Sequence, residues 1–353
     1  MLPKYSFFDL LHLMLERKAT DLLFSVGNPP QIRVNKKLMS LDFPPLDDAT
    51  TKALCYEVMN EYQQKKMEDE WEVDFSFGLK KLARFRANVY MQRNSVSASF
   101  RRIPVEILSF EELGLPPIVK TLSDLPNGLV LVTGRTGCGK STTLAAMIDR
   151  INSTQSNHII TIEDPIEYVH NHKKCTVDQR EVGTDTKGFH NALRSILRQD
   201  PDVVLLGEMR DPESIQSALT IAETGHLCFA TLHTNSCSQT LSRIIDVFSP
   251  EKQDQIRTQL SMCLNGVVSQ VLLPRIGGGV QLGLEIMVIT TAIRTNIREN
   301  KLHAIDNLIQ LGSKYGMQTM NQSLTGLVKT GVVAEEDAFK ASLDKEDFRK
   351  IMM

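Results

Sequence analysis

The feature that most constrains this chain is a glycine-rich phosphate-loop motif at residues 134–143, which read Gly-Arg-Thr-Gly-Cys-Gly-Lys-Ser-Thr-Thr. The motif lies between the apolar run 129–132 and the run 144–148, so it predicts a strand, a loop and a helix. In such a loop the backbone N–H groups and the helix start meet phosphate, Lys140 reaches the β and γ oxygens, and Ser141 offers a hydroxyl to Mg²⁺. An ordinary glycine-rich turn is the alternative, but few chance matches fall at a strand-to-helix junction.

The size and composition indicate a globular protein with room for two domains. The chain has 353 residues, of which 42% are hydrophobic and 23% charged, and its formal net charge is −2. A net charge this close to zero does not indicate a basic surface that binds duplex nucleic acid. The six cysteines form no C-x-x-C pair, so we expect reduced thiols, as in the cytosol. We expect neither a secretory signal nor a membrane span, because polar residues interrupt the apolar stretches.

The first part of the chain, residues 1–115, mixes helix and strand signals and predicts a small α+β domain with antiparallel strands. Its expected helices are 7–18 and 47–70, and its expected strands are 21–26, 31–34, 73–77, 83–91 and 97–103. Residues 116–126 carry prolines at both ends and read as an inter-domain linker.

The second part, residues 127–353, predicts a doubly wound α/β domain with a parallel sheet. Four short apolar runs, 129–132, 158–162, 203–206 and 228–232, have the pattern of strands buried on both faces. Residues 284–289 are a candidate further strand. Helices at 292–301, 304–312 and 321–330 are expected in a C-terminal cap that covers about 291–353.

Polar side chains follow each of the four apolar runs, at the sheet edge where ligands bind in open α/β folds. The first run leads into the phosphate loop. The second ends in the acidic segment 163–167, with Glu163 and Glu167; the third ends in Glu208, and the fourth in His233. Carboxylates and histidines at this edge can hold Mg²⁺ and orient a water for phosphoryl transfer. A helix cap or a solvated loop acid is the alternative for any one of them. Spacing alone does not show which of Glu163 and Glu167 acts on the water.

Several arginines are candidates for compensating phosphate charge. Arg84 and Arg86 alternate on one predicted strand and share a face, and Arg101 follows on the next strand. They can serve a nucleotide held by the other domain, in the same chain or in the next subunit, or they form a solvated strand face. Arg194 and Arg198 share a helix face and are either ion-pair formers or phosphate sensors.

Together, the phosphate loop, the acidic box 162–167, the segment 206–211 and the histidine box 224–234 resemble the secretion ATPase superfamily of VirB11-like and GspE-like proteins. The resemblance is closest to its type IV pilus retraction branch, the PilT-like and PilU-like ATPases, and it extends over essentially the whole chain. It includes Ala19-Thr20-Asp21-Leu22 and residues 29–34 in the first part.

The resemblance implies a PAS-like first domain, a RecA-like P-loop ATPase domain, a hexameric ring, and ATP with Mg²⁺. It implies that Ser141 and Glu208 hold Mg²⁺, that Glu167 positions or activates water, with Glu163 beside it in the same box, and that His226 and His233 form the histidine box. Nucleotide-binding residues are then expected in the loop and among the arginines of the first domain: Gly134, Thr136, Gly137, Cys138, Gly139, Lys140, Ser141, Thr142, Arg84, Arg86 and Arg101.

Two features favour the retraction branch over extension or type II secretion ATPases. The four-cysteine metal loop and the longer N-terminal part of those proteins are missing, and residues 292–299 resemble the AIRNLIRE helix of the retraction branch. A capped surface helix is the alternative for that segment. Within the loop, Arg135 and Cys138 replace the usual Pro and Ser or Thr; a thiol at a helix start tends toward thiolate, so we expect Cys138 to be oxidisable.

The sequence therefore predicts a cytoplasmic motor ATPase that acts at the inner membrane and disassembles a type IV pilus through a platform protein. A paralogous pilus ATPase is a further expected partner, and nucleic acid is not. The alternatives are an extension or secretion motor of the same superfamily and an accessory subunit that binds ATP without hydrolysing it.

Overall fold

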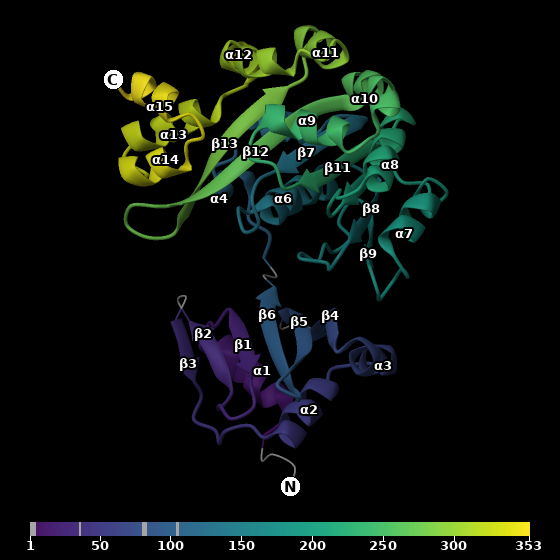
Figure 1. Cartoon of the computed structure of the whole chain (residues 1–353), viewed down its shortest axis with the longest axis vertical. Helices are drawn as coiled ribbons and strands as arrows, with labels where there is room; N and C mark the ends of the chain where they lie inside the picture. The colour runs from purple at the N-terminus through teal and green to yellow at the C-terminus, as the bar shows by residue number, and fades with distance from the viewer. Residues whose placement is uncertain (1–4, 35–36, 80–82, 104–105) are drawn as a thin grey trace. The chain divides into compact units, whose positions relative to one another are not determined.

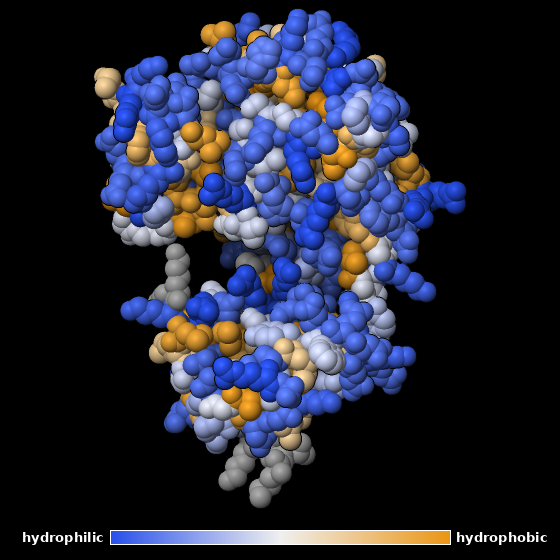
Figure 2. Space-filling model, viewed as in Figure 1, coloured by the Kyte–Doolittle hydropathy of each residue, from blue (hydrophilic) through white to orange (hydrophobic). Residues whose placement is uncertain are grey.

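The computed structural model describes residues 5–34, 37–79, 83–103 and 106–353. The chain forms two compact units. Unit 1 comprises residues 1–106 and 165–167, and unit 2 comprises 107–164 and 168–353. Residues 116–126, which we expected to form a linker, include helix α5 (Pro117–Ser123) and belong to unit 2. The predicted domain boundaries stay predictions. Hydrophilic residues cover most of the face visible in Figure 2, as expected when the apolar side chains lie in internal cores.

Unit 1 is a six-stranded sheet in which every neighbouring pair is antiparallel, in the order β3-β2-β1-β6-β5-β4 (Figure 1). Its strands are β1 (Asp21–Phe24), β2 (Gln31–Val34), β3 (Lys37–Ser40), β4 (Glu72–Leu79), β5 (Ala83–Gln92) and β6 (Ser95–Ile103). Phe85, Ala87 and Val89 alternate along β5 and are fully buried, so one face of the strand builds the core. Helix α1 (Phe7–Glu16) contributes Phe7, which packs edge-on against Phe100 of β6.

The helix expected over 47–70 is two helices, α2 (Asp48–Tyr56) and α3 (Glu61–Glu70). Asn60 starts the second one. Its side-chain oxygen accepts a hydrogen bond from the Gln63 N–H, and the Gln63 side-chain oxygen accepts one from the Asn60 N–H. This reciprocal cap satisfies helix-end donors that a continuous helix would bond internally, so it stabilises a break at this position.

Unit 2 contains the predicted parallel sheet, with seven strands in the order β13-β12-β7-β11-β10-β8-β9. All neighbouring pairs are parallel except β12 with β13. The strands are β7 (Gly128–Thr133), β8 (His158–Glu163), β9 (Thr176–Glu181), β10 (Val203–Leu206), β11 (Leu227–Leu232), β12 (Leu264–Pro274) and β13 (Val280–Val288). Helices α6 (Lys140–Thr154), α7 (Phe189–Ile196), α8 (Pro212–Glu223), α9 (Cys237–Asp246) and α10 (Pro250–Cys263) flank the sheet (Figure 1).

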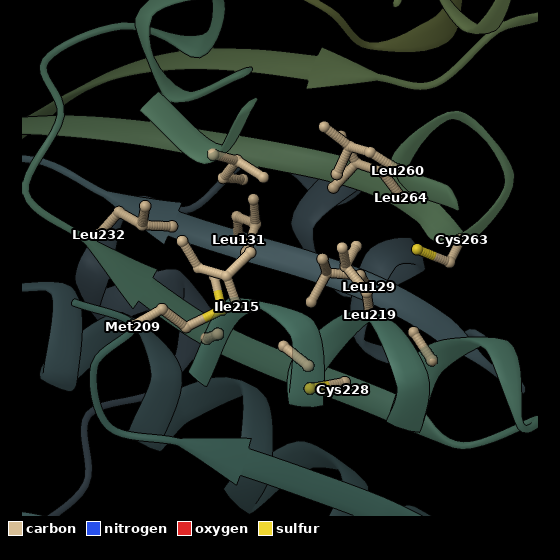
Figure 3. Close-up of a cluster of buried hydrophobic side chains, with 14 of the residues drawn as sticks. Leu129, Leu131, Met209, Ile215, Leu219, Cys228, Leu232, Leu260, Cys263 and Leu264 are labelled. Atoms are coloured by element: carbon tan, nitrogen blue, oxygen red, sulfur yellow. The ribbon is translucent and has the colours of Figure 1, made fainter. Parts of the chain in front are cut away.

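The sheet of unit 2 has a hydrophobic core on each face. Leu129 and Leu131 of β7 join one core, which also contains Ile215 and Leu219 of α8 (Figure 3). Val130 and Val132 point the other way and join a second core with residues of α6. This arrangement explains why the central strands read as unbroken apolar runs, and it confirms the predicted α/β class.

Strand β12 was not predicted, although it lies beside the strand that leads into the phosphate loop. Helix α10 ends at Cys263 and β12 begins at Leu264, so no glycine or proline separates them. A helix that passes directly into a strand leaves no turn signal in the sequence. Strand β9 and edge strand β3 were also missed.

The C-terminal cap contains α11 (Thr291–Arg298), α12 (Ile305–Gln310) and α13 (Met320–Lys329), which match the three predicted helices, followed by α14 (Glu335–Ala341) and α15 (Lys345–Met352). Glu285 of β13 is buried and accepts hydrogen bonds from the N–H groups of Cys237 (2.6 Å) and Met320 (3.4 Å). One carboxylate thus meets the first residues of α9 and α13. None of the helices in the described part of the chain is long and apolar enough to cross a membrane.

Candidate functional site

The phosphate loop has the geometry that its sequence predicts, because it connects the end of β7 to the start of α6. Gly134, Gly137 and Gly139 have φ angles of 142°, 79° and 89°, a region that glycine adopts without steric cost. The Lys140 side chain is 9% exposed, and its ammonium donates to the carbonyls of Gly134 (2.8 Å) and Arg135 (3.3 Å). The loop therefore holds a cation at its centre.

Gly134 could not be replaced by a larger residue without moving the backbone. A Cβ atom there would lie 2.4 Å from the Gln270 carbonyl oxygen and 2.5 Å from the Cys138 Sγ. The close packing of the loop on strand β12 therefore depends on glycine.

The Cys138 thiol is buried against the loop, and burial raises its pKa, although the Lys140 charge acts in the opposite direction. A thiol of raised pKa stays protonated at neutral pH, and the thiolate is the form that reacts with oxidants. The expectation that Cys138 tends toward thiolate is therefore wrong. Desolvation of the thiolate raises the pKa of Cys138 by more than the N–H groups at the helix start lower it.

The carboxyl ends of β7, β8, β10 and β11 meet at one edge of the sheet, as predicted. Leu206 pairs with Ile162 on one side and with Ala230 on the other, and Leu232 pairs with Thr133. The residues that follow these strands are therefore neighbours. This edge carries the phosphate loop, Glu163, Glu208 and His233.

His233 connects the phosphate loop to Glu208. Its Nδ1 lies 3.3 Å from the Thr136 hydroxyl, and its Nε2 lies 3.0 Å from Oε1 of Glu208. Arg210 donates to the other Glu208 oxygen at 2.7 Å. Burial would raise the pKa of Glu208, but the Arg210 hydrogen bond and the charges of His233 and Arg210 outweigh it, so the pKa is lowered and the carboxylate is ionised at neutral pH.

The two glutamates of the acidic box have different surroundings. Glu163 is 9% exposed, and its Oε1 accepts hydrogen bonds from the Thr161 hydroxyl (2.6 Å) and the Gln179 amide (3.1 Å). Glu167 is exposed and has no hydrogen-bond partner among the described residues. The surroundings of Glu163 suit a fixed structural carboxylate, and those of Glu167 suit a carboxylate that contacts solvent.

Ser141 and Glu208 are the residues predicted to hold Mg²⁺. Ser141 is partly exposed in the first turn of α6, directly after Lys140, and Glu208 is an ionised carboxylate at the same sheet edge. Oxygen donors of this kind fit Mg²⁺, which keeps several waters and takes most other ligands from phosphates. The described residues contain no cluster of three or more metal-ligating side chains, so an all-protein metal cage is not indicated there.

His226 lies at the opposite edge of the sheet from the phosphate loop. It precedes β11, whereas His233 follows it, so about six residues of strand, roughly 20 Å, separate them. Its Nδ1 lies 3.0 Å from the Thr224 hydroxyl and 3.1 Å from the Ile221 carbonyl. The structure of this chain does not bring His226 together with Glu208 and His233.

The three arginines predicted to approach a nucleotide all belong to unit 1. Arg86 and Arg101 are direct cross-strand partners, and Arg84 lies two residues from Arg86, so the three share a sheet face. Arg101 donates to Asp21 at 2.9 Å, and Arg33 also lies 3.5 Å from that buried carboxylate. Their approach to a nucleotide stays a prediction.

The remaining candidates have identifiable partners in unit 2. Arg194 forms an ion pair with Glu213 at 3.0 Å, which favours the ion-pair alternative for it. Arg135 donates to the Asn235 side chain at 3.3 Å, and the Thr142 hydroxyl lies 2.9 Å from the Tyr168 hydroxyl. Gln270, which contacts the loop from β12, was not found from the sequence.

Comparison with known proteins identifies close relatives over almost the full length. A family model described as "Type II/IV secretion system protein" matches residues 93–290. The type IV pilus retraction ATPase PilT of Pseudomonas aeruginosa is 50% identical over 96% of this chain and 99% of its own. The type IV pilus ATPase PilU of the same organism is 41% identical over 97% of this chain and 90% of its own.

A solved structure agrees with these relationships. The crystal structure of the pilus retraction motor PilT with bound ADP superposes on this chain with a TM-score of 0.93 and 50% sequence identity. The match covers 98% of this chain and 100% of the other.

Proposed function

Because the chain belongs to the type II/IV secretion system protein family, within its PilT-like branch, we propose that it is a motor ATPase that couples ATP hydrolysis to retraction of a type IV pilus. The observation that carries this proposal is the hydrogen-bonded connection from the phosphate loop through His233 to the ionised Glu208. It joins the residues that bind phosphate to those that can order a metal and a water.

The phosphate loop binds the triphosphate. In this proposal the Lys140 ammonium turns from the loop carbonyls to the β and γ oxygens, and the N–H groups of the loop and of the α6 start donate to phosphate. Mg²⁺, held through Ser141 and Glu208, would neutralise charge on the phosphates. Nucleotide binding by the ADP-bound relative supports this assignment.

His233 orients Glu208 with respect to the loop. Its Nε2–H donates to Glu208, and its Nδ1 lies within hydrogen-bond distance of the Thr136 hydroxyl. Arg210 holds the second carboxylate oxygen, so Glu208 has little freedom to rotate. We assign Glu167 as the residue that positions or activates the attacking water, because its exposed carboxylate can reach a solvent molecule, and we assign Glu163 to holding the acidic box in place.

We further propose that the motor is a homohexamer whose unit 1 arginines, Arg84, Arg86 and Arg101, compensate phosphate charge in the ring. It would act on the cytoplasmic side of the inner membrane through the platform protein of the pilus. A PilU-like paralogue is a further proposed partner, supported by the similarity of this chain to both ATPases of one organism.

The test combines purified protein and cells. The wild-type protein should hydrolyse ATP in the presence of Mg²⁺, and Lys140→Ala should abolish hydrolysis while circular dichroism shows an intact fold. Deletion of the gene should leave cells with pili that are present but no longer shorten. Normal hydrolysis by Lys140→Ala would refute the site, and pili that still shorten would refute the retraction function.

A further inference from the structure

We propose that Gln270 is a positioning residue for the phosphate loop, whose side-chain amide fixes one peptide group so that its N–H faces the phosphates of the bound nucleotide. The inference rests on the proposed nucleotide-binding function and adds a residue outside the motif. Gln270 is 1% exposed and belongs to β12, directly after the last residue that pairs with β7.

The Gln270 amide uses both of its polar atoms on the segment that binds phosphate. Its Nε2 donates to the Cys138 carbonyl at 2.7 Å, and its Oε1 accepts from the Thr143 hydroxyl at 3.0 Å. Both hydrogen bonds are buried. The amide has one favoured orientation, because reversing it would place the Gln270 Oε1 acceptor against the Cys138 carbonyl oxygen.

The hydrogen bond to the Cys138 carbonyl also sets the direction of the next N–H. In a planar trans peptide the C=O and N–H point in opposite directions. The Cys138 carbonyl points toward β12, so the Gly139 N–H points away from β12. This N–H has no hydrogen-bond partner among the described residues. It is the last donor before α6, at the helix end where an anion is stabilised.

Two glycines allow the loop to lie this close to Gln270. A Cβ on Gly134 would lie 2.4 Å from the Gln270 backbone oxygen, and one on Gly139 would lie 3.3 Å from its Nε2. Gln270 therefore packs closely against the phosphate loop at both ends, at Gly134 and at Gly139. An amide suits this place because it is neutral, whereas a carboxylate at the same position would repel the phosphates.

The experiment measures equilibrium binding of a fluorescent ADP to the full chain. Gln270→Met removes the amide at similar volume, and Gln270→Glu keeps an acceptor for Thr143 but has no donor for Cys138. Gln270→Met should weaken ADP binding on the order of 10- to 100-fold, the effect of losing a hydrogen bond to a charged group. Gln270→Glu should weaken it at least as much, because its carboxylate also repels the phosphates. The matched control Thr325→Val removes a buried threonine hydroxyl whose hydrogen bond to the Asn321 carbonyl lies within α13, outside the phosphate loop, and it should bind ADP within about threefold of wild type.

Amide hydrogen exchange distinguishes positioning from a general structural role. ADP should slow exchange at the Gly139 N–H in wild type and in Thr325→Val, and it should not do so in the Gln270 variants. Thermal unfolding without nucleotide verifies that each variant is folded. If wild type fails to bind ADP, the proposed function fails and the inference with it. If wild type binds ADP and folded Gln270→Met or Gln270→Glu binds it equally well, the inference alone is overturned.

Discussion

Replacing His233 by alanine tests whether the connection between the phosphate loop and Glu208 contributes to catalysis. The substitution removes the contacts to Thr136 at 3.3 Å and to Glu208 at 3.0 Å, and it leaves Arg210 as the remaining partner of that carboxylate. Glu208 then rotates more freely. Residues that orient a metal ligand, as we propose His233 does for Glu208, typically contribute 10- to 100-fold to activity, so we expect kcat for ATP to fall by that factor, or about 1.4–2.7 kcal/mol of activation free energy.

The cost to stability should be much smaller. The side chains of His233 and Glu208 are 41% and 24% exposed, so solvent screens the pair and its loss should cost about 1 kcal/mol or less. For a unit of this size that is a Tm decrease of about 2–4 °C or less. A large loss of kcat with a small change in Tm is therefore the signature of positioning.

His190→Ala is a matched control for this substitution. His190 is 42% exposed and lies 3.7 Å from Asp211 and 3.5 Å from Glu213, so it is also a histidine between acidic groups, but it belongs to α7. We expect its kcat to stay within about twofold of wild type, since it contacts none of the site residues. The assay is steady-state ATP hydrolysis with Tm measured in parallel. Equal kcat values for His233→Ala and wild type would refute the reasoning, and so would equal losses in both variants.

Three further predictions concern other residues of the chain. Glu167→Gln should lower ATP turnover at least 100-fold and leave ADP binding unchanged, and unchanged turnover would return the role to another acid. Burial lowers the pKa of His158, but its hydrogen bonds to the Asp200 carbonyl and to Asp178, together with the nearby carboxylate charges, raise the pKa overall. The protonated His158 therefore stabilises the fold fully below about pH 6.5, and this stabilisation is lost as pH rises through the folded-state pKa. Urea unfolding between pH 5.5 and 8.5 should show this decrease, and His158→Gln should remove it; identical pH profiles would contradict the assignment. The Cys138 thiol should react with a thiol reagent at pH 7.5 only after unfolding, which mass spectrometry of the labelled peptide can detect, and rapid labelling of the native protein would disprove its protection.

Local patterns predicted much of the fold and of the site. The central strands of unit 2 are apolar on both faces, and the phosphate loop is a contiguous motif, so neither needed knowledge of distant contacts. The convergence of Glu163, Glu208 and His233 followed from the rule that the carboxyl ends of parallel strands share an edge.

The features that the sequence did not predict depend on contacts between distant segments. The role of Gln270 follows from the pairing of β12 with β7, which lie more than 130 residues apart along the chain, and from a helix that passes into a strand without a turn. The raised pKa of the Cys138 thiol depends on burial by neighbouring residues, whereas the helix start alone favoured a lowered pKa. The edge at which His226 lies follows from its position before β11, since residues before and after a strand belong to opposite edges.

Strand β12 carries two contacts that are three residues apart. Gln270 lies beneath the phosphate loop, and Leu273 is buried in the hydrophobic cluster of the C-terminal cap with Met320 and Leu324. An extended backbone has a fixed rise, so these points are held about 10 Å apart and cannot approach one another. The strand therefore sets a constant spacing between the phosphate loop and the cap, so a displacement of Gln270 along the strand axis would also displace Leu273.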